Sequence, residues 1–437
     1  MDTNRFRRGS LRISAALGLA AAGGGLAVVT SLPASASAAP ASGSSGSAGS
    51  APVQVSGRPL YTTMGGANPL PTDSTVPHWF GSFTDPTNDV TYGYNMVGNG
   101  DPRTYTGETT VPTEIIPLDF TFSNGQSLNG SDATTAIEAS PVFQNNSYST
   151  VKLSRKGKKL ALSNDAGTTQ LEDATMRSQF NVTNSTFHLL LGQPTVLPTQ
   201  TISVPANQGI IASFGSGFRA FGDVDINWFS AHLTNLLSSL HISSTTLPIF
   251  LTNNVYLYEG GNPSNCCVLG YHGATSNANA QGNEAVQTYA YAAYIQPGTW
   301  STSTEPASPD GSDAYYLQDI HGLSHEISEW ADDPFVNNSV DPWLTPTAPQ
   351  YGCSSYLETG DPVVGIGALV GTNPYFQTAG ANADGAWHPE DEVFLPWFAR
   401  QSPNTTSEPI QGGTTGRYTF FGTINPYPGF QQPATGC

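Results

Sequence analysis

The sequence predicts a β-rich α+β protein in which a metal-type amphipathic helix packs on a mixed sheet. Loops and turns are favoured by the 46 glycines and 33 prolines among the 437 residues. Segments with the alternating pattern of strands surround a few segments with helical periodicity. One helical segment carries two histidines and two glutamates on a single face. This order of segments is typical of helices packed on a mixed sheet.

Residues 1–38 have the features of a secretory signal peptide. Four arginines between positions 5 and 12 form a basic region, an apolar run follows, and small residues near position 36 provide a cleavage site. Residues 39–56 are rich in Ala, Ser and Gly, which predicts a disordered linker. We therefore expect a secreted, soluble protein without a membrane anchor once the signal is removed.

Residues 57–437 are predicted to form a globular α+β domain, with a sub-boundary near 185–200. Within it, residues 152–159 hold five basic residues, which indicates an exposed hairpin tip or a proteolytic processing site. The strand pattern covers 114–122, 187–191, 201–204, 210–213, 247–258 and 285–295, and helices are expected over 131–137, 170–180 and 223–240.

A helix over 313–332 is predicted to carry the functional site. Its apolar residues share one arc of the helix, and His321, His325, Glu326 and Glu329 share the opposite arc. Because positions four apart lie one turn apart on the same face, His325 and Glu329 can bind the same ion. The alternative is a surface helix whose polar face is simply solvated.

The run from His325 to Glu329 has the donors that catalytic zinc sites use. Zinc accepts imidazole nitrogen and carboxylate oxygen, and catalytic sites leave one position for water. Glu326 directly follows the histidine, where the glutamate of the H-E-x-x-H pattern accepts a proton from that water. The pattern predicts zinc as the cofactor, and calcium, which prefers oxygen ligands, is the alternative.

A third ligand is required for a zinc site, and Glu358 is the candidate. It lies 29 residues after Glu329 in the segment L-E-T-G-D-P, whose Gly-Asp turn lets the backbone approach an ion. His321 is one turn before His325, but ligands at i, i+4 and i+8 would span about 12 Å of helix axis. His321 and Asp361 are therefore expected to bind substrate or to orient a ligand.

The other histidines lack metal-type spacing. His272 follows a cysteine pair by five residues, and His388 stands in the segment A-W-H-P-E. For both positions, a structural histidine held by hydrogen bonds is the expected role.

The four cysteines are predicted to form two disulfides, because an exported protein matures in an oxidising compartment. Cys266 and Cys267 are adjacent and can pair with each other only through a strained ring. We therefore expect each of them to bond elsewhere, which leaves Cys353 and Cys437 as their partners.

The charge balance disfavours nucleic acid as a partner. Removal of residues 1–38 lowers the basic count from 15 to 11 and the acidic count from 33 to 32, so the net charge becomes −21. Such a surface repels nucleic acid and anionic lipid. The expected partner is an extracellular polypeptide or a cell-wall substrate.

The sequence contains three further motifs: S-H-E-x-x-E-W at 324–330, L-E-x-G-D-P at 357–362 and C-C-x-x-G-x-H at 266–272. Together they resemble a group of secreted bacterial proteins of unassigned function, and the likeness extends over much of residues 110–400. The first two motifs are also distantly similar to the phosphate-induced, exordium-like family, from which the chain departs at Trp330 and Val363. That resemblance implies export and a common site for the two motifs, and it implies no catalytic activity.

The leading functional hypothesis is a secreted zinc-dependent hydrolase of the zincin-like metallopeptidase type. In this hypothesis His325, Glu329 and Glu358 bind the metal and Glu326 is the general base. The alternative is a non-catalytic secreted or cell-wall-associated exordium-like protein, with a structural metal or none.

Overall fold

The computed structural model describes most of the chain beyond residue 73 and two short segments before it. The predicted signal peptide, 1–38, lies outside the described residues, as does most of the predicted linker. At the end of that linker, Val53–Gln54 forms strand β1. The described residues belong to one compact unit, Gly49–Cys437. They are 51–55, 66–68, 74–148, 151–155, 158–162, 166–278, 284–302, 316–346, 348–349, 352–376, 385–403, 418–421 and 432–437.

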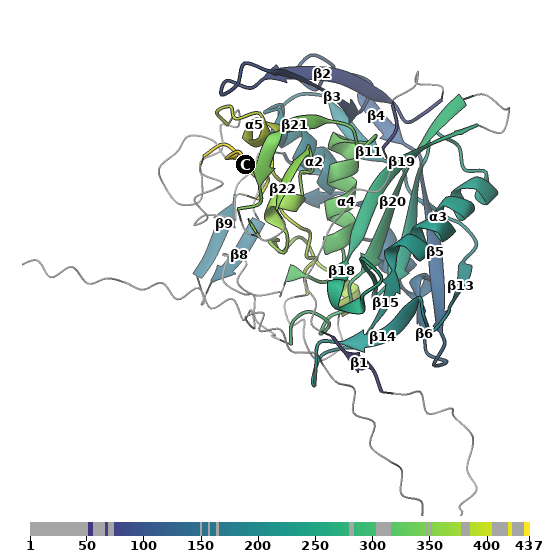
Figure 1. The fold of residues 1–437 in the computed structure, drawn as a ribbon. Helices are drawn as coiled ribbons and strands as arrows, with labels where there is room; N and C mark the ends of the chain where they lie inside the picture. Colours follow the sequence, from purple (N-terminus) through teal and green to yellow (C-terminus); the bar gives the residue numbers. More distant parts are fainter. Residues whose placement is uncertain are drawn as a thin grey trace, which may run out of the picture. The chain divides into compact units, whose positions relative to one another are not determined.

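The central element is a mixed seven-stranded sheet (Figure 1). Strand β16 is parallel to both of its neighbours, β5 and β20, and β19 closes one edge antiparallel to β20. Strands β13 and β6 also pair with β5. The order is β12 (Thr195–Val196), β5 (Thr113–Phe122), β16 (Leu247–Asn253), β20 (Glu284–Tyr294) and β19 (Gly270–Ala278), with β13 (Gln200–Val204) and β6 (Ser127–Asn129) at β5.

A second sheet of five strands contains β1. Its order is β1, β14 (Gly209–Ser213), β15 (Phe221–Asp225), β17 (Val255–Tyr258) and β18 (Cys266–Val268). The remaining strands form two-stranded ladders: β2 (His78–Thr84) with β3 (Thr91–Val97), β4 (Glu108–Val111) with β11 (His188–Leu191), β7 (Asn146–Ser147) with β10 (Thr168–Thr169), β8 (Val151–Arg155) with β9 (Lys158–Leu162), and β21 (Ser339–Leu344) with β22 (Cys353–Tyr356).

Helices α3 and α4 pack on opposite faces of the central sheet. Side chains of a strand alternate between the two faces, and β16 follows this rule: Phe250 packs in the core that contains α3, whereas Ile249 and Leu251 pack in the core that contains α4. Helix α4 contacts β19 and β20 directly. The helices are α1 (Thr134–Glu138), α2 (Leu171–Gln179), α3 (Ile226–Leu240), α4 (His321–Asp332) and α5 (Leu395–Phe398).

The predicted β-rich α+β class is confirmed, and most of the predicted elements are present. The expected strand over 247–258 is divided into β16 and β17 at Asn254, whose φ of 57° is left-handed and interrupts the extended backbone. In the segment with five basic residues, β8 and β9 pair antiparallel, and residues 156–157 between them lie outside the described residues. None of the helices in the described part of the chain is long and apolar enough to cross a membrane.

Two predicted helices begin later than expected. Asp223 belongs to β15, and α3 starts only after Asp225, whose carboxylate accepts hydrogen bonds from the N–H groups of Asn227 and Trp228 at 3.0 Å. Residues 313–315 of the predicted metal helix lie outside the described residues. Helix α4 begins only at His321, because Asp319 adopts a left-handed φ of 42° and bridges to β20's end through backbone hydrogen bonds.

The predicted disulfide pairing is wrong. Cys353 in β22 bonds to Cys437, at a Cα–Cα distance of 6.2 Å, which ties the chain terminus to this strand. Cys266 pairs with its neighbour Cys267 in β18. Because the tertiary structure brings Cys353 and Cys437 together, neither is available to the adjacent pair.

Candidate metal centre

The polar arc of α4 is buried. Every residue of the helix is buried, and His321, His325, Glu326 and Glu329 are each at most 3% exposed. The apolar arc packs against β19 and β20, and the polar arc faces the loops that follow β22. The alternative of a surface helix with a solvated polar face is therefore wrong.

His325 lies at one side of a group of carboxylates. Its Nε2 is 3.1 Å from Glu329 Oε1 and 3.8 Å from Asp361 Oδ1. Its Nδ1 is 2.7 Å from Glu390 Oε2, so the ring donates its Nδ1 hydrogen to this carboxylate. The imidazole thereby directs the Nε2 lone pair toward Glu329 and Asp361, which is the arrangement in which carboxylates orient metal-binding histidines.

Glu390 is held in place by its own contacts. Its Oε1 accepts a hydrogen bond of 3.0 Å from the Gly365 backbone, and its backbone N–H donates to Ser324 Oγ at 2.9 Å. The same carboxylate lies 3.3 Å from His321 Nε2. His321 therefore contacts Glu390, the residue that orients His325. It belongs to neither group of three candidate metal ligands in this cluster.

The loop after Glu358 approaches α4 very closely. The backbone N–H groups of Gly360 and Asp361 both donate to Glu329 Oε1 at 3.1 Å. A Cβ at Gly360 would collide with the imidazole of His325. Only glycine therefore lets this loop bring the Asp361 carboxylate beside the helix.

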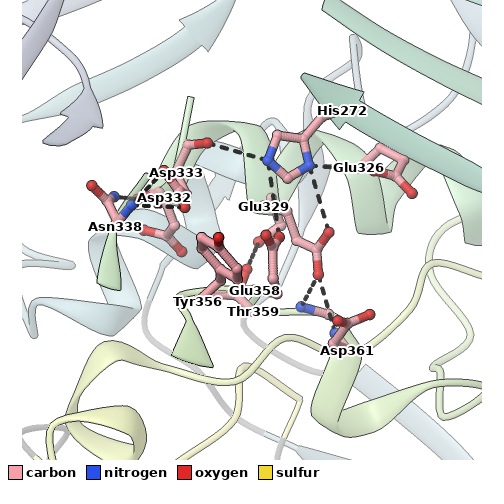
Figure 2. Close-up of polar contacts among 12 residues, drawn as sticks. His272, Glu326, Glu329, Asp332, Asp333, Asn338, Tyr356, Glu358, Thr359 and Asp361 are labelled. Atoms are coloured by element: carbon pink, nitrogen blue, oxygen red, sulfur yellow. Dashed lines mark hydrogen bonds and ion pairs between the residues drawn. The ribbon is translucent and has the colours of Figure 1, made fainter. Parts of the chain in front are cut away.

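His272, from β19, lies on the other side of the helix carboxylates (Figure 2). Its Nε2 donates to the backbone carbonyl of Asp333 at 3.2 Å, which leaves the Nδ1 as a lone pair. That Nδ1 is 3.5 Å from Glu326 Oε2 and 3.6 Å from Glu329 Oε2. Close approach is again set by a glycine, since a Cβ at Gly270 would meet the Glu326 side chain.

Glu358 lies in the same cluster and faces the other ring nitrogen of His272 from Glu326 (Figure 2). Its Oε2 is 3.9 Å from His272 Nε2, and the residue is 1% exposed. Within the described part of the chain, neither oxygen of Glu358 or of Glu326 has a hydrogen-bond donor. Buried carboxylates normally have such partners or contact a cation.

The electrostatics show how costly this cluster is without a cation. Burial raises the pKa of Glu326, Glu329 and Glu358 well above the usual value, and repulsion from the neighbouring carboxylates raises the pKa of each further. Burial also lowers the pKa of His272 to about 3, so this imidazole is neutral. Among the described residues, no lysine or arginine forms an ion pair with these carboxylates, and the basic side chains nearest to them are histidines.

Two groups of three side chains in this cluster have their ligand atoms within 4.8 Å of one another: His272 with Glu326 and Glu329, and His325 with Glu329 and Asp361. Two ligands at about 2.1 Å from a tetrahedral ion are separated by about 3.4 Å. The nitrogen–oxygen distances of 3.1 to 3.8 Å within the two groups have this spacing. A third group, Asp223 with Cys266 and Cys267, contains the disulfide-paired cysteines.

The structure brings all six site residues of the sequence analysis into one region, although with different neighbours. His325 and Glu329 lie together, Asp361 joins them, and Glu358 lies beside His272. Glu326 faces His272. The sequence analysis gave a structural role to His272 and none to Glu390. The G-Y-H segment after the cysteine pair could have indicated His272 as a site residue. No motif spacing could have indicated Glu390.

His388 keeps the structural surroundings that the sequence analysis expected. Its Nδ1 lies 2.8 Å from Asp319 Oδ2, and its backbone N–H donates to Asp319 Oδ1 at 3.0 Å. Both residues are completely buried. This contact holds the segment before Glu390 against the start of α4.

Comparison with known proteins provides no relative. No model of a known protein family, no curated protein and no solved structure matches the chain. The functional argument therefore depends on the site alone.

Proposed function

We propose that this protein is a secreted zinc-dependent hydrolase that acts as a zincin-like metallopeptidase. The observation that supports the proposal is the lone pair of an oriented imidazole facing carboxylate oxygens in a buried cluster. When Glu329 is ionised, His325 Nε2 and Glu329 Oε1, 3.1 Å apart, are both acceptors, so neither donates a hydrogen to the other. A cation between them removes this repulsion. Imidazole with carboxylate is a donor set that suits zinc.

The residues around this pair have roles in the proposed reaction. His325 and Glu329 hold the ion, and Asp361 or Glu358 provides a further ligand. Bound zinc would polarise the scissile carbonyl and lower the pKa of a water to about 7. Glu326 accepts the proton of that water and delivers it to the leaving amine. Glu390 keeps the His325 imidazole in the tautomer that binds metal.

Asp361 is the group of this cluster that reaches solvent. Its side chain is 26% exposed, whereas those of His325, Glu326 and Glu329 are at most 4% exposed. A polypeptide substrate would therefore approach from the Asp361 side. The proposed substrates are extracellular polypeptides or peptide parts of the cell wall.

The test is hydrolysis of a peptide library by the purified mature protein with zinc. Glu326→Gln keeps the shape of the side chain and removes its basicity, so we expect activity to fall by about 10²- to 10⁴-fold. The matched control is Glu284→Gln, at an exposed glutamate of β20, which should leave activity unchanged. Equal activity of Glu326→Gln and the wild type would contradict the proposed role of Glu326.

A second candidate function is a closed structural metal site in a non-catalytic secreted protein. Deep burial favours it, because Glu326, Glu329 and Glu358 are each at most 3% exposed. In that case zinc would bind and chelation would destabilise the fold, but no peptide would be hydrolysed. Stable zinc binding without hydrolysis would decide for this alternative.

A further inference from the structure

Two carboxylates of α4 each lie between two imidazoles. Glu329 places Oε1 3.1 Å from His325 Nε2 and Oε2 3.6 Å from His272 Nδ1. Glu326 does the same, with Oε1 4.0 Å from His325 Nε2 and Oε2 3.5 Å from His272 Nδ1. Each carboxylate therefore turns one oxygen toward each ring, as a carboxylate does when it bridges two metal ions.

The two imidazoles present the cluster with nitrogens of the same kind. His325 is oriented by Glu390 and His272 by the backbone carbonyl of Asp333, through the ring nitrogen that faces away from the helix carboxylates. The nitrogen that faces Glu326 and Glu329 is then a lone pair in both rings. A single ion beside His325 would not relieve the repulsion between the Nδ1 lone pair of His272 and the ionised oxygens of Glu326 and Glu329.

Glu326 is the residue that best distinguishes a site for one ion from a site for two. It is 1% exposed, and within the described part of the chain no donor reaches either of its oxygens. Glu326 directs its two oxygens at two different rings. This geometry fits a bridging ligand.

We propose that the cluster binds a pair of divalent metal ions, one held by His325, Glu329 and Asp361 and the other by His272, Glu326 and Glu329. Glu329 and Glu326 connect the two positions. Paired ions about 3.5–4 Å apart are used by aminopeptidases and phosphatases to stabilise both oxygens of a displacement. This inference rests on the proposed metal-dependent function and changes one role in it: Glu326 is the general base beside one ion and a ligand when two ions are bound.

The test is the metal content of the purified mature protein, freed of metal by a chelator and reconstituted with zinc alone. We expect two zinc ions per chain, measured by elemental analysis after removal of free zinc. His272→Ala should lower the content to one, and the matched control His232→Ala, at an exposed position of α3, should keep two. Reconstitution with Mn²⁺ should give the electron paramagnetic resonance spectrum of two coupled ions.

The outcomes separate the two proposals. One zinc per wild-type chain, unchanged in His272→Ala, would overturn the metal pair and leave the single-zinc hydrolase standing. No zinc in the wild type would overturn both. The wild-type content and its Mn²⁺ spectrum need no variant, so they decide the question even if His272→Ala fails to fold.

Discussion

Helices α3 and α4 cover opposite faces of one sheet, yet their polar sides have opposite surroundings (Figure 1). In α3, Phe229, Leu233 and Leu237 are buried, whereas His232 and Asn235 are exposed to solvent. In α4 the polar side is as buried as the apolar side. Water satisfies the polar side of α3. The polar side of α4 requires partners supplied by the protein, and in the proposed function a cation balances the carboxylates there.

The two helices also differ in how their ends are fixed. Asp225 caps α3 with its side chain, and His241 ends it in a left-handed conformation with a φ of 53°. Helix α4 has no side-chain cap. Local residues thus define α3, whereas α4 depends on contacts with distant segments.

The largest expected effect is that of metal removal on the α4 side. Metal that binds only the folded state, at about a thousand times its dissociation constant, stabilises that state by about 4 kcal/mol. We expect chelator treatment to lower the free energy of unfolding by about this amount, measured by urea denaturation, with recovery on addition of zinc. Identical unfolding curves with and without chelator would show that α4 needs no cation.

On the α3 side, loss of apolar contact should dominate. Leu233 is 1% exposed, so Leu233→Ala should lower the free energy of unfolding by about 2–5 kcal/mol through lost burial and a cavity. Asn235→Ala, at an exposed position of the same helix, is the control and should have almost no effect. Zinc content should be the same in both variants, and a loss of zinc in Leu233→Ala would show that the two faces are coupled.

Asp223 is a buried carboxylate outside the candidate metal centre, so it extends the comparison of the two sides of the sheet. Asp223 in β15 is fully buried, and no hydrogen-bond donor reaches it from the described residues. Burial raises its pKa well above 3.8, so the folded state holds this proton to higher pH than the unfolded chain does.

The stabilising contribution of protonated Asp223 is therefore present at low pH and is lost as pH rises from about 3.8 through the raised pKa. The expected slope is about 1.4 kcal/mol per pH unit. Asp223→Asn should remove this loss, so its stability relative to the wild type should increase from pH 4 upward, measured by urea unfolding at several pH values. A constant difference between the two proteins would contradict the prediction.

The smallest expected effect is at the start of α3. Asp225→Ala removes the two cap hydrogen bonds and should cost about 1 kcal/mol, measured by the same urea unfolding. Asp225→Asn should recover most of this, because asparagine also caps helices well. A cost well above 2 kcal/mol in the alanine variant would mean that Asp225 has a further role in the fold.

Local sequence patterns were sufficient to predict the elements whose apolar residues have a regular spacing. Alternation over 114–122 predicted β5, and the apolar spacing after Asp225 predicted α3, because each pattern reports directly on one buried face. The start of α4 was beyond such patterns. Asp319 ends the possible helix there through a bridge to Ile295, the residue directly after β20.

The sequence by itself determined the chemistry of α4: a histidine and two glutamates spaced to share one face. Only the tertiary structure decided that this face is buried, that His272 comes to it from β19, and that Cys353 pairs with Cys437. The physical reason is that helical spacing fixes distances within one turn or two, whereas the approach of β19 and of the Gly360 loop depends on packing between distant segments. The same spacing would serve a solvated helix or a metal site, and burial excludes the solvated helix.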